Sequence, residues 1–140
     1  MKNRIFIYTF LVPLQKIFIE GVNLDKPNKK KPESQQNKIS KTMLPQELAE
    51  IVLGGISTDP GVLNYELLEN NPVEIDGQSG FRAVYLDKNK DGLQYRNIYY
   101  GFIHKNWYYR ILYSAPLRYY FYKDVETYEH IVESFKLIKK

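Results

Sequence analysis

Between residues 81 and 114, aromatic and apolar side chains alternate with polar ones over three runs, a pattern typical of β-strands. Two short segments with turn chemistry separate the runs: KNKDG at residues 88–92 and Lys105-Asn106. Three strands joined by such tight turns can only be antiparallel neighbours. The sequence therefore predicts a three-stranded meander with strands at residues 81–87, 93–104 and 107–114.

The N-terminal residues predict a second β-hairpin, with strands at residues 4–11 and 14–22 joined near Pro13. Both segments are rich in Ile, Phe, Val and Tyr. The run from Ile5 to Leu14 follows two basic residues and so resembles a secretion signal, but Gln15 and Lys16 interrupt it and no small-residue cleavage site follows. It is also shorter than the about 20 apolar residues that span a bilayer. We expect strands here.

Residues 25–42 are predicted to form a linker rich in lysine and proline. Six lysines and a single glutamate, Glu33, lie within residues 26–41, so this segment carries more than the whole net charge of +4. A basic face that binds nucleic acid would place its lysines on ordered elements. We therefore expect a solvated linker and no nucleic-acid partner. The chain has no cysteine, which excludes disulfides, cysteine-ligated metals and thiol catalysis, and we expect no cofactor.

Two helices are predicted. The first follows the linker, where Leu44, Leu48 and Val52 recur at helical spacing, with Thr42 as its cap, Pro45 in its first turn and the Gly54-Gly55 pair at its end. The second spans about residues 123–137, and its apolar stripe consists of Val125, Tyr128, Val132 and Phe135. Between the first helix and the meander, we expect a strand at residues 62–69, a short piece at 73–75 and a turn at Asp76-Gly77.

These elements predict one α+β domain over residues 1–140, with an antiparallel sheet, made of the meander plus an N-terminal hairpin, and two helices packed on it. Its parts are the hairpin at 1–24, the linker at 25–42 and the main body at 43–140. The two-residue turn pairs His104 with Trp107 and Phe102 with Tyr109. One face should then be the core beneath the helices: Phe81, Ala83, Ile98, Tyr100, Phe102, Trp107, Tyr109, Ile111 and Tyr113.

The opposite face of the predicted meander mixes Tyr, Arg and Asn, which is the composition of many binding surfaces. Gly101 lies opposite Arg110 in this register and would leave room for the arginine. An ordinary solvated face explains the same residues. The candidate binding face consists of Arg82, Tyr95, Asn97, Tyr99, Tyr108 and Arg110, beside Val84, Leu112 and Ser114.

Three other segments deserve a chemical interpretation. Asp87, Asn89 and Asp91 match the first half of a calcium loop, but Ile98 stands where the bidentate glutamate belongs, and a hairpin turn explains the same residues. Arg118 and Tyr119 form a secondary candidate for an anion or peptide site; a packed corner is the alternative. His104 and His130 are isolated in sequence, and no catalytic motif is found.

Several stretches resemble a group of small bacterial envelope lipoproteins with the PsbP-like fold. They are residues 43–50 (MLPQELAE), 89–102 (NKDGLQYRNIYYGF), 107–109 (WYY), 115–121 (APLRYYF) and Ser134-Phe135. The resemblance implies an antiparallel sheet sandwiched or flanked by helices, a non-catalytic role and a tether through an acylated N-terminal cysteine. This sequence departs from the last feature, because it contains no cysteine.

The predicted function is a non-enzymatic binding or accessory domain of the bacterial cell envelope or periplasm. It would contact a protein partner through the Tyr/Arg face and associate with membrane only through a lipidated segment outside these residues. The alternative is a small-ligand-binding or weakly hydrolytic domain with a cleft between the sheet and the C-terminal helix. A cytoplasmic location is the alternative for the compartment.

Overall fold

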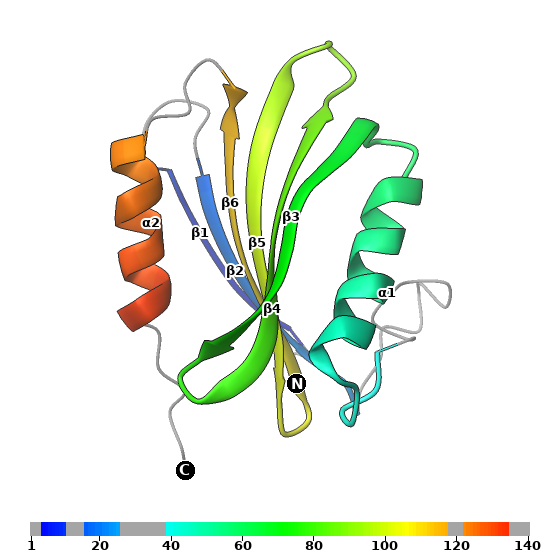
Figure 1. Ribbon diagram of the computed structural model, residues 1–140, viewed down its shortest axis with the longest axis vertical. Helices are drawn as coiled ribbons and strands as arrows, with labels where there is room; N and C mark the ends of the chain where they lie inside the picture. The colour runs from blue at the N-terminus through cyan, green and yellow to red at the C-terminus, as the bar shows by residue number, and fades with distance from the viewer. Residues whose placement is uncertain (1–3, 11–15, 26–38, 118–121, 135–140) are drawn as a thin grey trace.

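The computed structural model describes residues 4–10, 16–25, 39–117 and 122–134, and it contains a six-stranded antiparallel sheet (Figure 1). The order of the strands across the sheet is β1-β2-β6-β5-β4-β3. The predicted α+β class and its antiparallel sheet are therefore confirmed. The strands are β1 (Arg4–Phe10), β2 (Lys16–Asn23), β3 (Leu63–Ile75), β4 (Gln78–Lys88), β5 (Gln94–His104) and β6 (Trp107–Pro116).

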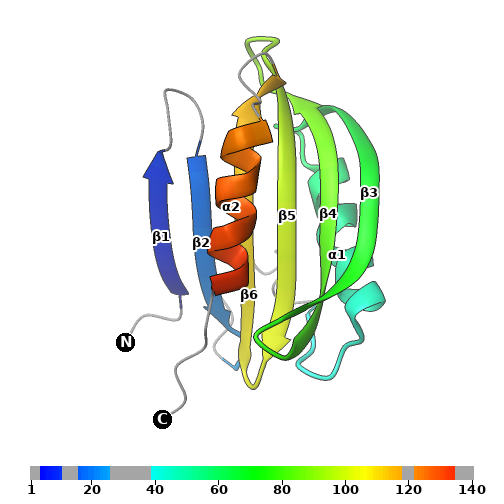
Figure 2. The same ribbon diagram turned by 60° about the vertical axis from the view of Figure 1, so that its left-hand side comes forward.

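Two helices, α1 (Pro45–Thr58) and α2 (Tyr122–Ser134), lie on opposite faces of this sheet. Figure 2 shows α2 in front of β2 and β6, whereas α1 lies behind β4 and β3. The prediction that both helices share one face was wrong. The physical reason is visible in β5, where the unbroken run from Asn97 to Phe102 is buried. A strand with both faces buried lacks the polar alternation that marks a single core face.

The register of the meander confirms the predicted β5–β6 pairing and corrects the faces assigned to the side chains of β4. In the β5–β6 pair, His104 lies opposite Trp107 and Phe102 opposite Tyr109, as the two-residue turn predicts. In the β4–β5 pair, Phe81 lies opposite Gly101 and Ala83 opposite Tyr99. Phe81 and Ala83 therefore face α1, not the predicted core beside Tyr100 and Phe102. Because side chains alternate along a strand, assigning one residue of β4 to the wrong face misplaces every side chain of the strand.

Each face of the sheet carries its own apolar core. Because β2 pairs with β6, the N-terminal hairpin joins the meander and contributes to both cores. The core under α2 consists of Ile17, Ile75, Val84, Ile98, Tyr100, Phe102, Ile111, Tyr113, Ala115, Tyr128 and Val132. The core under α1 consists of Val22, Ile39, Leu48, Ala49, Val52, Leu53, Phe81, Ala83, Tyr85, Tyr99 and Tyr108.

The space that Gly101 leaves is occupied by the ring of Phe81. The prediction that this space accommodates Arg110 was wrong. A Cβ atom built at Gly101 would lie 2.6 Å from Cε1 of Phe81. The Phe81 ring stacks on Tyr99, with 5.6 Å between the ring centroids. The absence of a side chain at Gly101 therefore allows an aromatic pair to lie flat across β5 beneath α1.

The ends of α1 differ from the predicted ones. Leu44 is the N-cap residue, and its backbone N–H donates to Oε1 of Glu47 over 2.9 Å. Thr42 does not cap the helix, because its hydroxyl pairs with that of Ser40. The helix also continues through Gly54 and Gly55 to Thr58, whose hydroxyl donates to the carbonyl of Gly54 over 2.9 Å. Packing of the preceding turns against the sheet outweighs the low helix propensity of glycine.

The remaining strands and helix match the predicted ones, with differences in their bounds. The two separate strands expected before Asp76 form one continuous strand, β3. Its pairing with β4 shifts register at two places. Asp76 and Gly77 both have positive φ, as a tight hairpin turn requires. In α2, Tyr128 and Val132 are buried, and Val125 packs against the same core. Phe135 and most of the predicted linker lie outside the described residues.

Four of the buried tyrosines, Tyr85, Tyr99, Tyr108 and Tyr128, predict alkaline unfolding. Burial raises the pKa of each phenol above the ordinary value of 10.0. Above pH 10 the unfolded chain loses these protons while the folded chain keeps them, so the free energy of unfolding falls as the pH rises. We expect stability to be unaffected by these groups below pH 10 and lost progressively above it. Tyrosinate absorbance of these four residues should appear together with loss of circular dichroism; ionisation well before unfolding would contradict the prediction.

Candidate functional site

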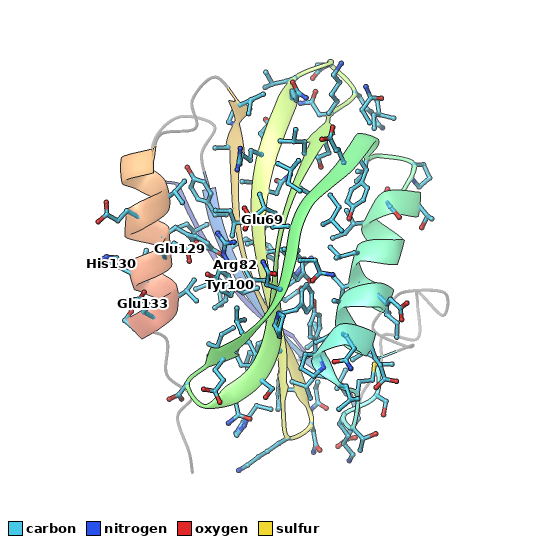
Figure 3. All side chains as sticks on the ribbon, in the orientation of Figure 1. Glu69, Arg82, Tyr100, Glu129, His130 and Glu133 are labelled. Carbon is cyan, nitrogen blue, oxygen red and sulfur yellow. The ribbon has the colours of Figure 1, made fainter. Side chains whose placement is uncertain are left out.

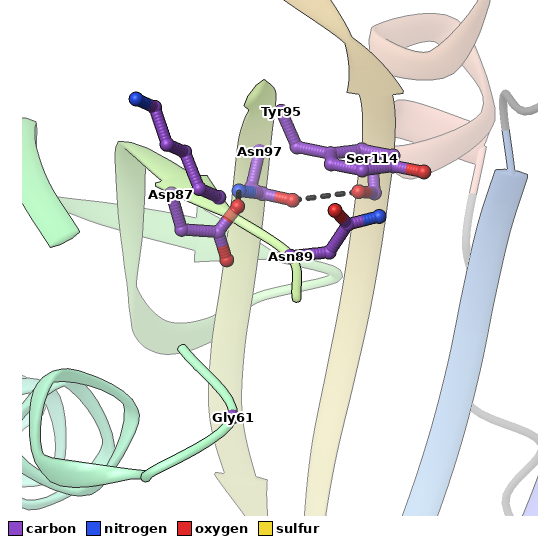
Figure 4. Close-up of a pocket in the computed structure, with 7 residues that line it drawn as sticks. Gly61, Asp87, Asn89, Tyr95, Asn97 and Ser114 are labelled. Carbon is purple, nitrogen blue, oxygen red and sulfur yellow. Dashed lines mark hydrogen bonds between the residues drawn. The ribbon is translucent and has the colours of Figure 1, made fainter. Parts of the chain in front are cut away.

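A polar pocket of about 270 Å³ lies at one end of the sheet, on the face that α1 covers (Figure 4). Register explains why its residues converge: Asn97 lies opposite Ser114, and Tyr95 lies opposite Asp87. The lining residues come from the α1–β3 loop (Gly61), β4 (Asp87, Lys88), the β4–β5 turn (Asn89), β5 (Tyr95, Asn97) and β6 (Ser114).

Hydrogen bonds between strands hold the inner part of the pocket. The hydroxyl of Ser114 donates to Oδ1 of Asn97 over 2.7 Å. The amide nitrogen of Asn97 donates to the carbonyl of Tyr85 over 3.3 Å and to Oδ1 of Asp87 over 3.2 Å. Asn97 and Ser114 are only 4% and 6% exposed. This network sets which atom of each side chain faces the pocket, because a buried amide keeps the orientation that satisfies its partners.

The β4–β5 turn forms the rim of the pocket, and Asn89 shapes it. Oδ1 of Asn89 accepts the backbone N–H groups of Asp91 and Leu93, each over 3.0 Å. Gly92 takes the positive φ that ends the turn. The oxygen of Asn89 is thus used within the turn, and its NH₂ group is the part that can serve a ligand.

The calcium alternative for Asp87, Asn89 and Asp91 gains no support from this turn. Asp87 lines the pocket and is bonded to Asn97, whereas Asp91 is exposed and is not among the lining residues. Across the described parts of the chain, no three His, Asp or Glu side chains gather in a way that could hold a metal ion. The Asx-type turn accounts for the sequence of this segment.

The structure divides the predicted Tyr/Arg face. Tyr95 and Asn97 reach the polar pocket, but Tyr99 and Tyr108 are only 2% and 5% exposed and their hydroxyls bond to each other. These two tyrosines belong to the core under α1, so the six residues do not form one exposed binding surface, and that expectation was wrong. The missing information was the second helix layer, since α1 covers the face that had been predicted to be open.

Arg110 is engaged by the N-terminal hairpin. Its Nε lies 2.8 Å from Oε1 of Glu20, which is directly opposite on β2, although the N–H does not point along this line. Its guanidinium also lies 4.7 Å from the centroid of the Phe18 ring. The ion pair and the ring hold Arg110 against the sheet, which explains this arginine structurally.

Arg82 lies on the other face, in a charged cluster that joins α2 to the sheet (Figure 3). Its guanidinium bonds to Glu129 of α2 over 2.9 Å and to Glu69 of β3 over 3.2 Å. Tyr100 donates to the second oxygen of Glu129, and burial, together with this hydrogen bond, raises the pKa of the Tyr100 phenol. His130 is exposed on α2. Where α2 meets the sheet, the side chains of Tyr128 and Val132 are buried.

Sequence reasoning did not include Lys88 and Gly61 in the site, and it placed Ser114 on the candidate face without counting it among the binding residues. The predicted register already placed Ser114 opposite Asn97, and this polar pair on adjacent strands was the signal that could have found the pocket floor. Gly61 comes from a loop whose position depends on α1. The secondary candidate, Arg118 and Tyr119, lies outside the described residues.

The network predicts an asymmetric response to mutation. Asn97→Ala should lower the free energy of unfolding by about 2 kcal/mol, because the buried Ser114 hydroxyl loses its acceptor. Ser114→Ala, which removes one hydroxyl and keeps the other bonds of Asn97, should cost about 1 kcal/mol. Urea unfolding measures both values. Equal stabilities of the two variants would show that Asn97 does not organise the pocket.

The fold and the pocket define a class: a three-layer α+β domain whose central antiparallel sheet carries a helix on each face and a polar pocket at one end. No protein-family model and no curated protein matches the sequence. Solved structures do match. Among them is PA94 from Pseudomonas aeruginosa, a protein of unknown function proposed to be a regulator, with a TM-score of 0.66 and 5% identity over 100% of this chain and 86% of that one.

A second similar structure is LpqN from Mycobacterium tuberculosis, a protein involved in cell envelope biogenesis. Its TM-score is 0.56 and its identity 7%, over 96% of this chain and 78% of that one. At these identities the similarity shows a shared fold. Among the described residues, neither helix is long and apolar enough to cross a membrane.

Proposed function

We propose that this chain is a non-enzymatic binding domain of the bacterial cell envelope and that the polar pocket is its recognition site. The observation that carries the proposal is the Asp87–Asn97–Ser114 network, which holds polar groups in fixed orientations at the base of a pocket. Binding sites of small molecules generally combine a concave surface with a few oriented polar groups.

The chemistry of the pocket supports binding over catalysis. The Ser114 hydroxyl donates to an amide oxygen, and an amide cannot take the proton that a serine nucleophile must lose. Asp87, which could serve as a base, accepts a hydrogen bond from Asn97 instead of lying next to a nucleophile. These groups are suited to orient a ligand.

The envelope location draws on two independent supports. LpqN, which shares the fold, is involved in cell envelope biogenesis. The stretches within residues 43–137 that resemble PsbP-like envelope lipoproteins include the β4–β5 turn and β5, which build the pocket. The partner is accordingly proposed to be an envelope component that presents a small polar group to Asn89, Tyr95 and Asn97.

The proposal is tested by NMR titration of the ¹⁵N-labelled chain with a panel of monosaccharides, amino acids, inorganic phosphate and calcium chloride. At least one probe should shift the side-chain amide signals of Asn89 and Asn97, and Tyr95→Ala should weaken that binding. Leu67→Ala, on an exposed side chain of β3, is the matched control and should leave it unchanged. Fractionation of the source bacterium should recover the protein with the envelope. A panel that moves no pocket signal, or recovery in the cytosol, would contradict the respective half of the proposal.

A further inference from the structure

The charges that line the polar pocket balance. Asp87 contributes one carboxylate and Lys88 one ammonium group, while Asn89, Tyr95, Asn97 and Ser114 are neutral. A site for a phosphate or a carboxylate would gather cationic donors, and a site for a divalent cation would gather several carboxylates. A pocket with no net formal charge instead suits a neutral ligand.

The hydrogen-bonding groups of the pocket include donors and acceptors side by side. Asn89 can offer its NH₂ group, because its oxygen is used in the turn. Ser114 donates to Asn97 and so presents oxygen lone pairs to a ligand. The phenol of Tyr95 can do both. Hydroxyl groups also donate and accept, so a ligand with several neighbouring hydroxyls matches this set.

Tyr95 adds an aromatic wall. It is half-buried, and its ring lies beside the Asn97–Ser114 floor (Figure 4). A tyrosine ring offers an apolar face together with a polar tip. A sugar ring has the complementary form, with C–H groups on one face and hydroxyls around its edge.

The size of the pocket limits the ligand to one ring. Its volume of about 270 Å³ is just below the roughly 300 Å³ at which pockets for drug-sized ligands begin. Asp87, Lys88, Asn89 and Tyr95 are only half-buried, and the adjoining turn residues 90–92 are exposed. A single unit can therefore sit between Tyr95 and Asn89 while the rest of a longer molecule extends into solvent.

We infer that the pocket binds a neutral saccharide unit, such as the terminal residue of a glycan. This inference rests on the proposed function, since it names the ligand class of the same site. Tyr95 would pack on the apolar face of the sugar ring, and Asn89, Ser114 and Asp87 would bond to its hydroxyls.

The experiment is an NMR titration of the ¹⁵N-labelled chain with N-acetylglucosamine, methyl glucoside and short oligosaccharides of each. Glucuronic acid, glucosamine, glycine and calcium chloride are the charged comparators. The neutral saccharides should shift the side-chain amide signals of both Asn89 and Asn97 and should bind more tightly than the comparators.

Two pairs of variants locate the binding. Tyr95→Ala should weaken it roughly three- to tenfold through loss of the ring contact, whereas Tyr95→Phe, which keeps the ring, should weaken it less. Asn89→Asp removes the NH₂ donor but keeps the oxygen that holds the turn, and a lost hydrogen bond should weaken binding by roughly three- to tenfold. Unchanged backbone amide signals of Asp91 and Leu93 would show that the turn is intact in this variant.

The possible results separate the inference from the proposed function. Binding of glycine, glucuronic acid or calcium at the pocket signals, without binding of neutral saccharides, would overturn the inference and leave the binding domain standing. Saccharide binding that Tyr95→Ala and Asn89→Asp leave at full strength would place the sugar elsewhere and also overturn it. If no probe moves the signals of Asn89 and Asn97, both fall.

Discussion

Replacing Tyr128 with alanine is expected to lower the free energy of unfolding by about 4 kcal/mol, in the range measured for large aromatic residues in protein cores. Tyr128 is fully buried between α2 and the sheet. Its ring packs against Tyr113 and Tyr100, with centroid distances of 5.3 and 6.0 Å. The substitution would leave a cavity beneath α2, where Val132 is the other buried side chain among those of the helix that the structure describes. Urea unfolding followed by circular dichroism gives the value.

Tyr128→Phe is the matched control, because it keeps the ring and removes only the hydroxyl. That hydroxyl donates to the carbonyl of Ile111 over 2.9 Å and approaches that of Ile98 at 3.3 Å. Its loss should cost about 1 kcal/mol. If Tyr128→Ala were as stable as Tyr128→Phe, the ring would contribute nothing, and α2 would not be held on the sheet by this residue.

Gly80→Ala is expected to lower the free energy of unfolding by roughly 3 kcal/mol, the upper part of the range for overpacked sites. A Cβ atom at Gly80 would lie 2.4 Å from the carbonyl oxygen of Gly101 and 2.8 Å from Cβ of Phe102. The first of these is a backbone atom of the neighbouring strand β5, and the second is the side-chain atom bonded directly to that backbone. Their positions are fixed by the backbone, so no rotamer change can move them away. The β4–β5 pair would have to separate locally, and urea unfolding would show the loss.

Gly54→Ala is the matched control for this prediction. Gly54 lies inside α1, and a Cβ atom there would meet nothing within 4 Å. Alanine is a better helix former than glycine, so this variant should be more stable by about 0.5–1 kcal/mol. If Gly80→Ala were as stable as Gly54→Ala, the close approach of β4 and β5 at Gly80 would be refuted.

Local sequence patterns predicted the parts of this fold whose partners lie near in the chain. The Lys105-Asn106 turn determined the β5–β6 register, since a two-residue hairpin leaves one pairing. For β4 only the face was predicted and not the pairing, and its side chains were assigned to the wrong faces, since Phe81 and Ala83 lie on the face of Tyr99. The charge of Arg82 also led to a wrong assignment. This arginine was predicted to lie on the open face, but its guanidinium bonds to Glu129 of α2.

The candidate site was predictable only in part. Tyr95 and Asn97 were singled out for their chemistry, and the register already placed Ser114 beside Asn97. Tyr99, Tyr108 and Arg110 have the same chemistry, and they were assigned to the same face. Their burial depends on α1 and β2, and both elements are distant from them in sequence.

By itself, the sequence determined the kinds of element, most of their bounds and the pairing across the two-residue turn Lys105-Asn106, because these depend on neighbouring residues and on periods of two or 3.6 residues. The tertiary structure alone decided that the helices lie on opposite faces, that β2 pairs with β6, and that the polar residues of one face divide between a buried core and a pocket. Those outcomes depend on which apolar surfaces cover each other across the sheet, and a tyrosine or an arginine looks the same in the sequence whether a helix covers it or water does.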